Sequence, residues 1–168
     1  NARELFDSYL QQVFSQKGED WIESTLNDTC SLITCGVAAT PKYVDKEEGI
    51  PFLSAQNVKK SKIDLSKYRY ISKEHHANLT KKNKPENGDL LYSRVGAGFG
   101  EAAVIELDFE FSVYVSVTLI KPIKDEINSH FLKWFLNSPE TKAVAKASIS
   151  SSGVPNLNVK SVRSFYIS

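Results

Sequence analysis

The chain has 168 residues, a mass of 18.8 kDa and a formal net charge of +1, with 41% hydrophobic and 24% charged residues. This composition predicts a soluble globular domain and excludes a disordered chain, and no apolar run approaches the roughly 18 residues that a membrane span needs. The chain begins at Asn1 and contains no Met, so we expect an excised segment of a longer cytoplasmic protein.

The charges are segregated along the sequence. Residues 42–84 carry eleven basic and five acidic residues, and residues 127–168 carry five basic and one acidic, whereas residues 85–126 carry three basic and eight acidic. A fold that brings the two basic segments together would have a cationic face suited to a nucleic acid. Scattered solubilising charge explains the same distribution equally well.

Cysteine and histidine do not indicate a metal site. Cys30 and Cys35 have no further Cys or His at ligand spacing, so we expect neither zinc nor another metal. The adjacent His75 and His76 point in different directions on a strand or a helix. We therefore expect both to be surface histidines.

Residues 1–18 are predicted to be the end of a longer helix. Apolar residues recur at helical spacing with polar residues between them, and the pattern stops at Gly18. The apolar stripe requires a packing partner. Its residues are Leu5, Phe6, Tyr9, Leu10, Val13 and Phe14.

From Trp21 onward, short apolar runs alternate with turn residues, which is typical of strands. The clearest is residues 111–120, whose β-branched and aromatic side chains suit a pleated surface. The other predicted strands are residues 30–34, 50–54, 90–95, 102–107 and 162–167. Each is short, and we find no internal repeat.

Residues 128–147 return to helical spacing, with a break at Ser138 and Pro139 and a cap at Asn128 or Ser129. A polar loop follows at residues 148–155. We predict an α+β fold with a twisted, mostly antiparallel sheet or partial barrel, a small helical patch and the leading helix. Residues 19–168 are expected to form one domain.

Gly96, Gly98 and Gly100 follow a predicted strand. The segment lacks G-x-x-x-x-G-K-[ST], and a strand pattern follows the glycines where a dinucleotide site needs a helix. We predict a glycine-rich turn between two strands. Arg94, beside Ser93 and just ahead of the turn, is the side chain best suited to bidentate contact with guanine or phosphate.

No catalytic group is predicted. The serines of residues 148–152 are not part of a G-x-S-x-G elbow, and acidic residues such as Glu47 and Glu48 lie in solvated runs. We expect a chain that is not an enzyme and has no cofactor of its own.

Two segments, residues 54–60 and 151–160, combine amide side chains with lysine. Gln and Asn pair with adenine edges and Lys binds phosphates, although Asn also commonly closes turns. The candidate DNA-binding residues are Gln56, Asn57, Lys59, Lys60, Lys62, Lys81, Lys82, Ser93, Arg94, Asn156, Asn158 and Lys160.

The order of these segments resembles the specificity subunits of type I restriction-modification enzymes. The leading helix resembles the end of their helical spacer, and residues 21–26, 49–58, 87–94 and 153–158 follow in the order of a recognition domain. The resemblance covers nearly the whole chain. It departs at the C-terminus, where the proline-rich stretch and second spacer helix of the family do not follow.

The resemblance implies the second of two recognition domains, each reading one half of a bipartite double-stranded DNA target in the cytoplasm of a bacterium or archaeon. In that family, methylation subunits use S-adenosylmethionine to modify a flipped-out adenine, and restriction subunits use ATP and Mg to cut DNA. The apolar stripe would pack within the assembled subunit. Two alternatives stay open: the recognition domain of a fused restriction-methyltransferase, and a protein-interaction module that does not bind DNA.

Overall fold

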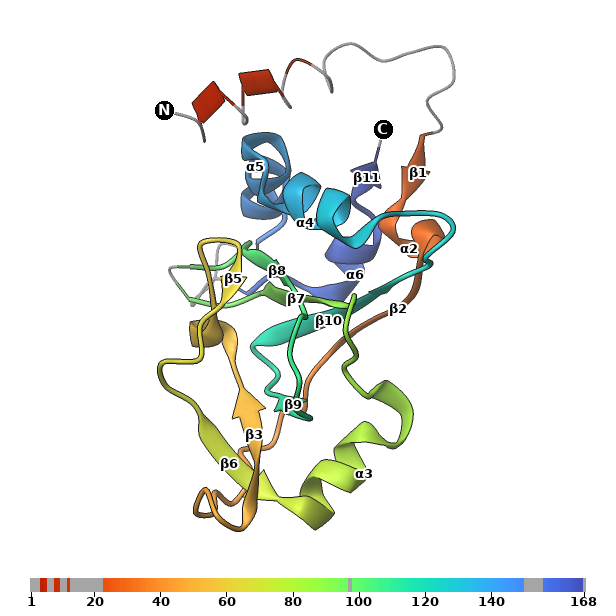
Figure 1. Ribbon diagram of the computed structural model, residues 1–168. Coiled ribbons are helices and arrows are strands. Elements are labelled where there is room, and N and C mark those ends of the chain that lie inside the picture. The colour runs from red at the N-terminus through yellow and green to blue at the C-terminus, as the bar shows by residue number, and fades with distance from the viewer. Residues whose placement is uncertain are drawn as a thin grey trace.

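The computed structural model describes residues 23–96, 98–149 and 156–167, together with residues 4, 5, 8, 9 and 12. It has the predicted α+β fold (Figure 1). No helix among the described residues is both long and apolar enough to cross a membrane.

The centre of the fold is a four-stranded antiparallel sheet in the order β2-β10-β7-β8. The strands are β2 (Cys30–Cys35), β10 (Val117–Pro122), β7 (Leu90–Ser93) and β8 (Ala102–Val104). All four residues of β7 are buried, because the sheet has a hydrophobic core on each face. Period-two alternation sends Leu90 to one core and Leu91 to the other.

Helices cover the face of this sheet on which Leu90 lies, which we call the first face, as Figure 1 shows. They are α2 (Leu26–Thr29), α4 (Ser129–Asn137), α5 (Pro139–Ala147) and α6 (Val159–Arg163), and beside them β1 (Ser24–Thr25) pairs antiparallel with β11 (Tyr166–Ile167). The Asn128 side chain accepts hydrogen bonds from the backbone N–H groups of His130 and Phe131, which confirms the predicted cap of α4.

The second face packs against smaller elements. The strands β6 (Arg69–Ser72), β3 (Gly49–Leu53) and β9 (Ser112–Val113) form a sheet in that order, in which β3 and β9 are parallel. The 3-10 helix η1 (Ala55–Asn57) leads into a hairpin of β4 (Val58–Lys59) and β5 (Lys62–Ile63). The helix α3 (Lys73–Asn83) follows β6.

Three predicted strands were wrong in extent. The strand predicted at residues 102–107 ends at Val104. Residues 111–120 are not one strand: Tyr114, Val115 and Ser116 separate β9 from β10, and the chain moves there from one sheet to the other. Residues 162–167 begin inside α6, and only Tyr166 and Ile167 form a strand. This helix spans Val159–Arg163, and the Asn158 side chain caps it by accepting a hydrogen bond from the Lys160 N–H.

His76 is not the surface histidine that we predicted. It lies on α3 with 6% of its surface exposed, and its Nδ1 is 2.9 Å from the Ser112 hydroxyl. Its Nε2 is 3.5 Å from a carboxylate oxygen of Glu110. Helix α3 thus docks on β9 through a buried polar contact, because the helix carries few large apolar residues for that purpose.

The predicted leading helix is described only at Glu4, Leu5, Ser8, Tyr9 and Gln12, which are helical. Leu5 and Tyr9 are 74% and 64% exposed. Phe6, Leu10, Val13, Phe14 and the expected domain boundary at residue 18 lie outside the described residues. The packing role of the stripe stays a prediction.

Candidate nucleic-acid interface

A groove of about 590 Å³, lined by polar side chains and by apolar surface, lies between the β3 and η1 region and the glycine turn that follows β7. Tyr43, Gln56, Lys59, Arg69, Gly96 and Tyr114 are among the residues that line it, and we call it the polar groove. It joins two segments that were predicted separately, residues 54–60 and the glycine turn.

Aromatic rings form part of the groove wall. The ring of Phe52 lies 6.3 Å from that of Tyr43 and 6.0 Å from that of Tyr114, measured between centroids. The guanidinium carbon of exposed Arg69 lies 5.1 Å from the centre of the Tyr43 ring. This cation-π contact orients a planar group with several donors at the groove, where it can meet phosphate or a base edge.

Asn57 and Gln56 have different environments although they are neighbours. Asn57 is 1% exposed: its Oδ1 accepts from the Ser54 N–H, and its Nδ2 donates to the carbonyl oxygens of Asp64 and Lys67. Asn57 therefore holds the backbone around η1. Gln56 is exposed and lines the polar groove, so its amide is available to a ligand.

The β4-β5 hairpin carries three exposed lysines, Lys59, Lys60 and Lys62. Lys59 forms an ion pair with Asp64 at 3.2 Å, and hydrogen bonds from Ser66 first and Lys59 second lower the pKa of that carboxyl to about 2. Lys60 and Lys62 line a second hollow together with Lys133 and Glu106. The two basic segments of the sequence thus meet beside this hairpin.

The polar segment before α6 reaches the glycine turn. Asn156 is exposed and forms an isolated antiparallel bridge with Val95, which lines the polar groove. Asn158 is the cap of α6, and Lys160 is exposed on the first turn of that helix. Residues 150–155 lie outside the described residues.

Ser93 and Arg94 are buried, with 0% and 8% of their surfaces exposed. The Ser93 hydroxyl donates to the Gly98 carbonyl and accepts from the Glu101 N–H. The Arg94 guanidinium donates to the carbonyl oxygens of Leu157 and Val115. Both side chains hold the glycine turn in place, and this structure gives no support to the expectation that they contact DNA directly.

Lys81 and Lys82 are exposed on α3 and line a third hollow, of about 400 Å³, with Cys35 of β2. They are thus separate from the group of Gln56, Lys59 and Arg69.

Three residues of the polar groove were not predicted from the sequence: Tyr43, Arg69 and Tyr114. Alternating basic and aromatic residues at 67–70, Lys-Tyr-Arg-Tyr, were the available signal for Arg69.

Comparison with known proteins identifies the family of the chain. A family model described as the type I restriction modification DNA specificity domain matches residues 18–168. A curated protein of Methanocaldococcus jannaschii, named as the MjaX type I restriction enzyme specificity subunit, is 25% identical over 152 residues. The match covers 86% of this chain but only 35% of that protein.

Solved structures have a similar fold. The HsdS subunit from Thermoanaerobacter tengcongensis matches with a TM-score of 0.66 and 18% identity, covering 98% of this chain and 37% of that one. The S subunit of a type I system from M. genitalium matches with a TM-score of 0.62 and 17% identity, over 98% of this chain and 41% of that one. The chain therefore spans less than half of each relative, and these identities establish the fold alone.

Proposed function

This chain belongs to the family of type I restriction modification DNA specificity domains, and on that basis we propose that its polar groove recognises double-stranded DNA by binding alone. The observation that carries the proposal is the convergence of Gln56, Lys59 and Arg69 on one groove, with Asn156 beside the glycine turn that borders it.

The side chains divide into two roles. Lys59, Lys60 and Lys62 of the hairpin neutralise phosphates, which gives affinity for any sequence. Gln56 and Asn156 supply amides that can pair with the edge of adenine, and Arg69 supplies a fork that suits guanine or phosphate. Discrimination between sequences therefore comes from these exposed side chains.

In the proposed biological setting, the domain reads one half of a bipartite target and directs the chemistry of partner subunits. Methylation subunits with S-adenosylmethionine and restriction subunits with ATP and Mg would act on the DNA that it selects. Leu5 and Tyr9, both exposed, would pack against a helix of the assembled subunit. The chain itself would contribute no catalytic group.

A binding titration tests the groove. A fluorescein-labelled 24-base-pair duplex of mixed sequence is titrated with the chain at several salt concentrations. Lys59→Gln should weaken binding and reduce the slope of log K against log salt by about 0.9, because one phosphate contact is lost. Lys124→Gln, in the acidic turn with Asp125 and Glu126, is the matched control and should leave the slope unchanged.

A lack of salt-dependent binding by the unaltered chain would contradict the proposal. Equal effects of Lys59→Gln and Lys124→Gln would place the DNA elsewhere on the molecule. Lys81→Gln, on α3, reports in the same assay whether the separate hollow near β2 also meets phosphate.

A further inference from the structure

The hairpin that carries Lys59, Lys60 and Lys62 has a turn in an unfavourable backbone conformation. Lys60 and Ser61 have φ values of 50° and 62°, in the left-handed region where glycine or asparagine is usual. Such turns persist where surrounding contacts hold them, and they are concentrated at functional sites.

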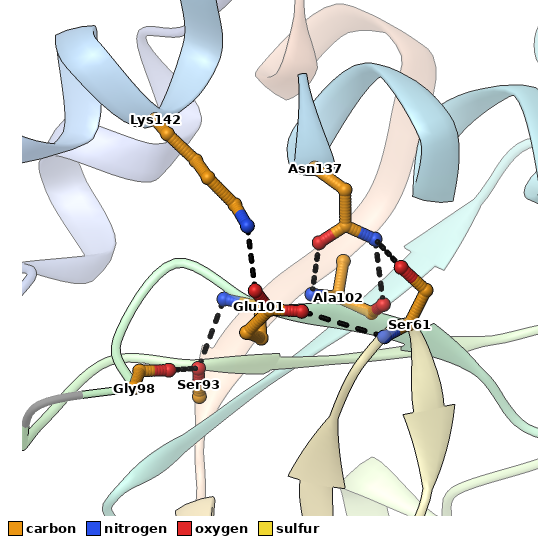
Figure 2. A network of polar contacts seen from close by, with 7 residues as sticks. All are labelled: Ser61, Ser93, Gly98, Glu101, Ala102, Asn137 and Lys142. Carbon is orange, nitrogen blue, oxygen red and sulfur yellow. Dashed lines mark hydrogen bonds and ion pairs between the residues drawn. The ribbon is translucent and has the colours of Figure 1, made fainter. Parts of the chain in front are cut away.

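A polar network around Asn137 holds this turn (Figure 2). The Asn137 Nδ2 donates to the Ser61 hydroxyl at 3.0 Å and to the Ala102 carbonyl at 2.9 Å, and its Oδ1 accepts from the Ala102 N–H at 2.9 Å. Asn137, the last residue of α4, thus fixes the tip of the hairpin against the first residue of β8.

Glu101 extends the same network to the glycine turn, as Figure 2 shows. Its Oε1 accepts from Lys142 at 2.5 Å, and its Oε2 accepts from the Ser61 N–H at 3.4 Å. Its own N–H donates to the Ser93 hydroxyl, which donates in turn to the Gly98 carbonyl. One cluster therefore connects the lysine hairpin with the turn that borders the polar groove.

We propose that Asn137 and Glu101 are positioning residues for DNA recognition: they hold the hairpin lysines and the glycine turn at a fixed separation, so that phosphate contacts and base contacts form together. The proposal rests on the proposed function of the groove. Neither residue needs to touch DNA.

A double-mutant cycle tests it, with the same 24-base-pair duplex at low salt and at a temperature where circular dichroism shows each variant folded. Asn137→Ala should weaken binding roughly 3- to 10-fold in the unaltered chain and less than about 1.5-fold in the Lys60→Gln/Lys62→Gln background. The two losses differ because substitutions at residues that act through one another have effects on binding free energy that do not add. Equal losses in the two backgrounds would overturn the proposal.

Ser61→Gly keeps the test sharp if Asn137→Ala does not fold. Glycine adopts positive φ without strain, so this change removes the hydroxyl contact with Asn137 without adding strain to the turn. We expect weaker DNA binding together with faster amide exchange at Lys62 and Ile63. Unchanged binding would contradict the positioning role. Absence of duplex binding by the unaltered chain would overturn the function as well, whereas additive losses overturn only this inference.

Discussion

The Nε of Arg94 donates a hydrogen bond to the carbonyl oxygen of Leu157 at 2.9 Å, joining residues 63 positions apart in the sequence. The backbone pairs at the same place, since the Leu157 N–H donates to the Arg94 carbonyl at 2.7 Å. This contact attaches the segment before α6 to the end of β7. It thereby holds Asn156 next to the glycine turn.

Arg94→Met should therefore destabilise the fold. The change removes two charge-assisted hydrogen bonds and leaves the carbonyls of Leu157 and Val115 without these donors, for a loss on the order of 3 kcal/mol. Urea denaturation measures this loss. Relative affinities for single-base variants of a bound duplex should stay as they were, because the backbone pair between the Leu157 N–H and the Arg94 carbonyl remains and still holds Asn156 at the glycine turn. A stable Arg94→Met variant that loses about 1 to 3 kcal/mol of discrimination at a single base pair would instead make Arg94 a reader of guanine.

Gln56→Ala should change sequence preference and leave most of the non-specific affinity. Gln56 is exposed at the polar groove and has the two-point donor and acceptor pattern that adenine matches. We expect a loss of about 1 to 3 kcal/mol of discrimination at one base pair, measured by competition with single-base variants. Lys59→Gln serves as the contrasting variant, because it should weaken all sequences alike. A uniform loss with Gln56→Ala would exclude base readout by this residue.

Tyr92→Phe should leave the free energy of unfolding unchanged or raise it by up to about 1 kcal/mol. The Tyr92 side chain is fully buried, and its hydroxyl has no hydrogen-bond partner among the described residues. Burial also raises the pKa of this hydroxyl. Thermal unfolding measures the change, with Tyr43→Phe at the groove as the comparison. A marked destabilisation would reveal a partner for the hydroxyl, such as a buried water.

Ionisation of the Cys30 thiol should lower the free energy of unfolding at alkaline pH. Burial raises the pKa of its thiol from 9.0 to about 11, so the folded state keeps a proton that the unfolded state releases first. The contribution of this thiol to the free energy of unfolding should be complete below about pH 8.5 and should fall by on the order of 2 kcal/mol towards pH 11. Denaturation between pH 7 and 11 checks this by comparing the unaltered chain with Cys30→Ala and, as a control, Cys35→Ala. The fall should be smaller only in Cys30→Ala.

The elements that could be predicted are those with strong local signals. The β7-β8 hairpin follows from apolar runs around glycines, and α4 and α5 follow from helical spacing with a cap at Asn128 and a break at Ser138 and Pro139. Helix α3 was missed because it is mostly polar and docks through His76. The break between β9 and β10 depends on distant partners, since the Tyr114 N–H donates to the Leu53 carbonyl and the Val115 N–H to the Val37 carbonyl.

The candidate site was predictable in composition but not in detail. Gln56 and Lys59 stand out because amide and lysine side chains cluster in a short polar segment, and the structure places both at the polar groove. The neighbouring Asn57 has the same chemistry, and only the folded chain shows that Asp64 and Lys67 occupy its amide. The role of Asn137 was likewise hidden, because its partners Ser61 and Ala102 are 76 and 35 residues away.

We propose that this domain selects a DNA sequence for its partner subunits, and the experiment to make first is a genome-wide map of adenine methylation. Cells express the parent protein with its methylation subunit, either unaltered or with this segment replaced by the corresponding segment of a relative. We predict a bipartite methylated motif in which only one half changes after the replacement. Methylation with both halves unchanged would contradict the claim and favour a domain that binds protein alone.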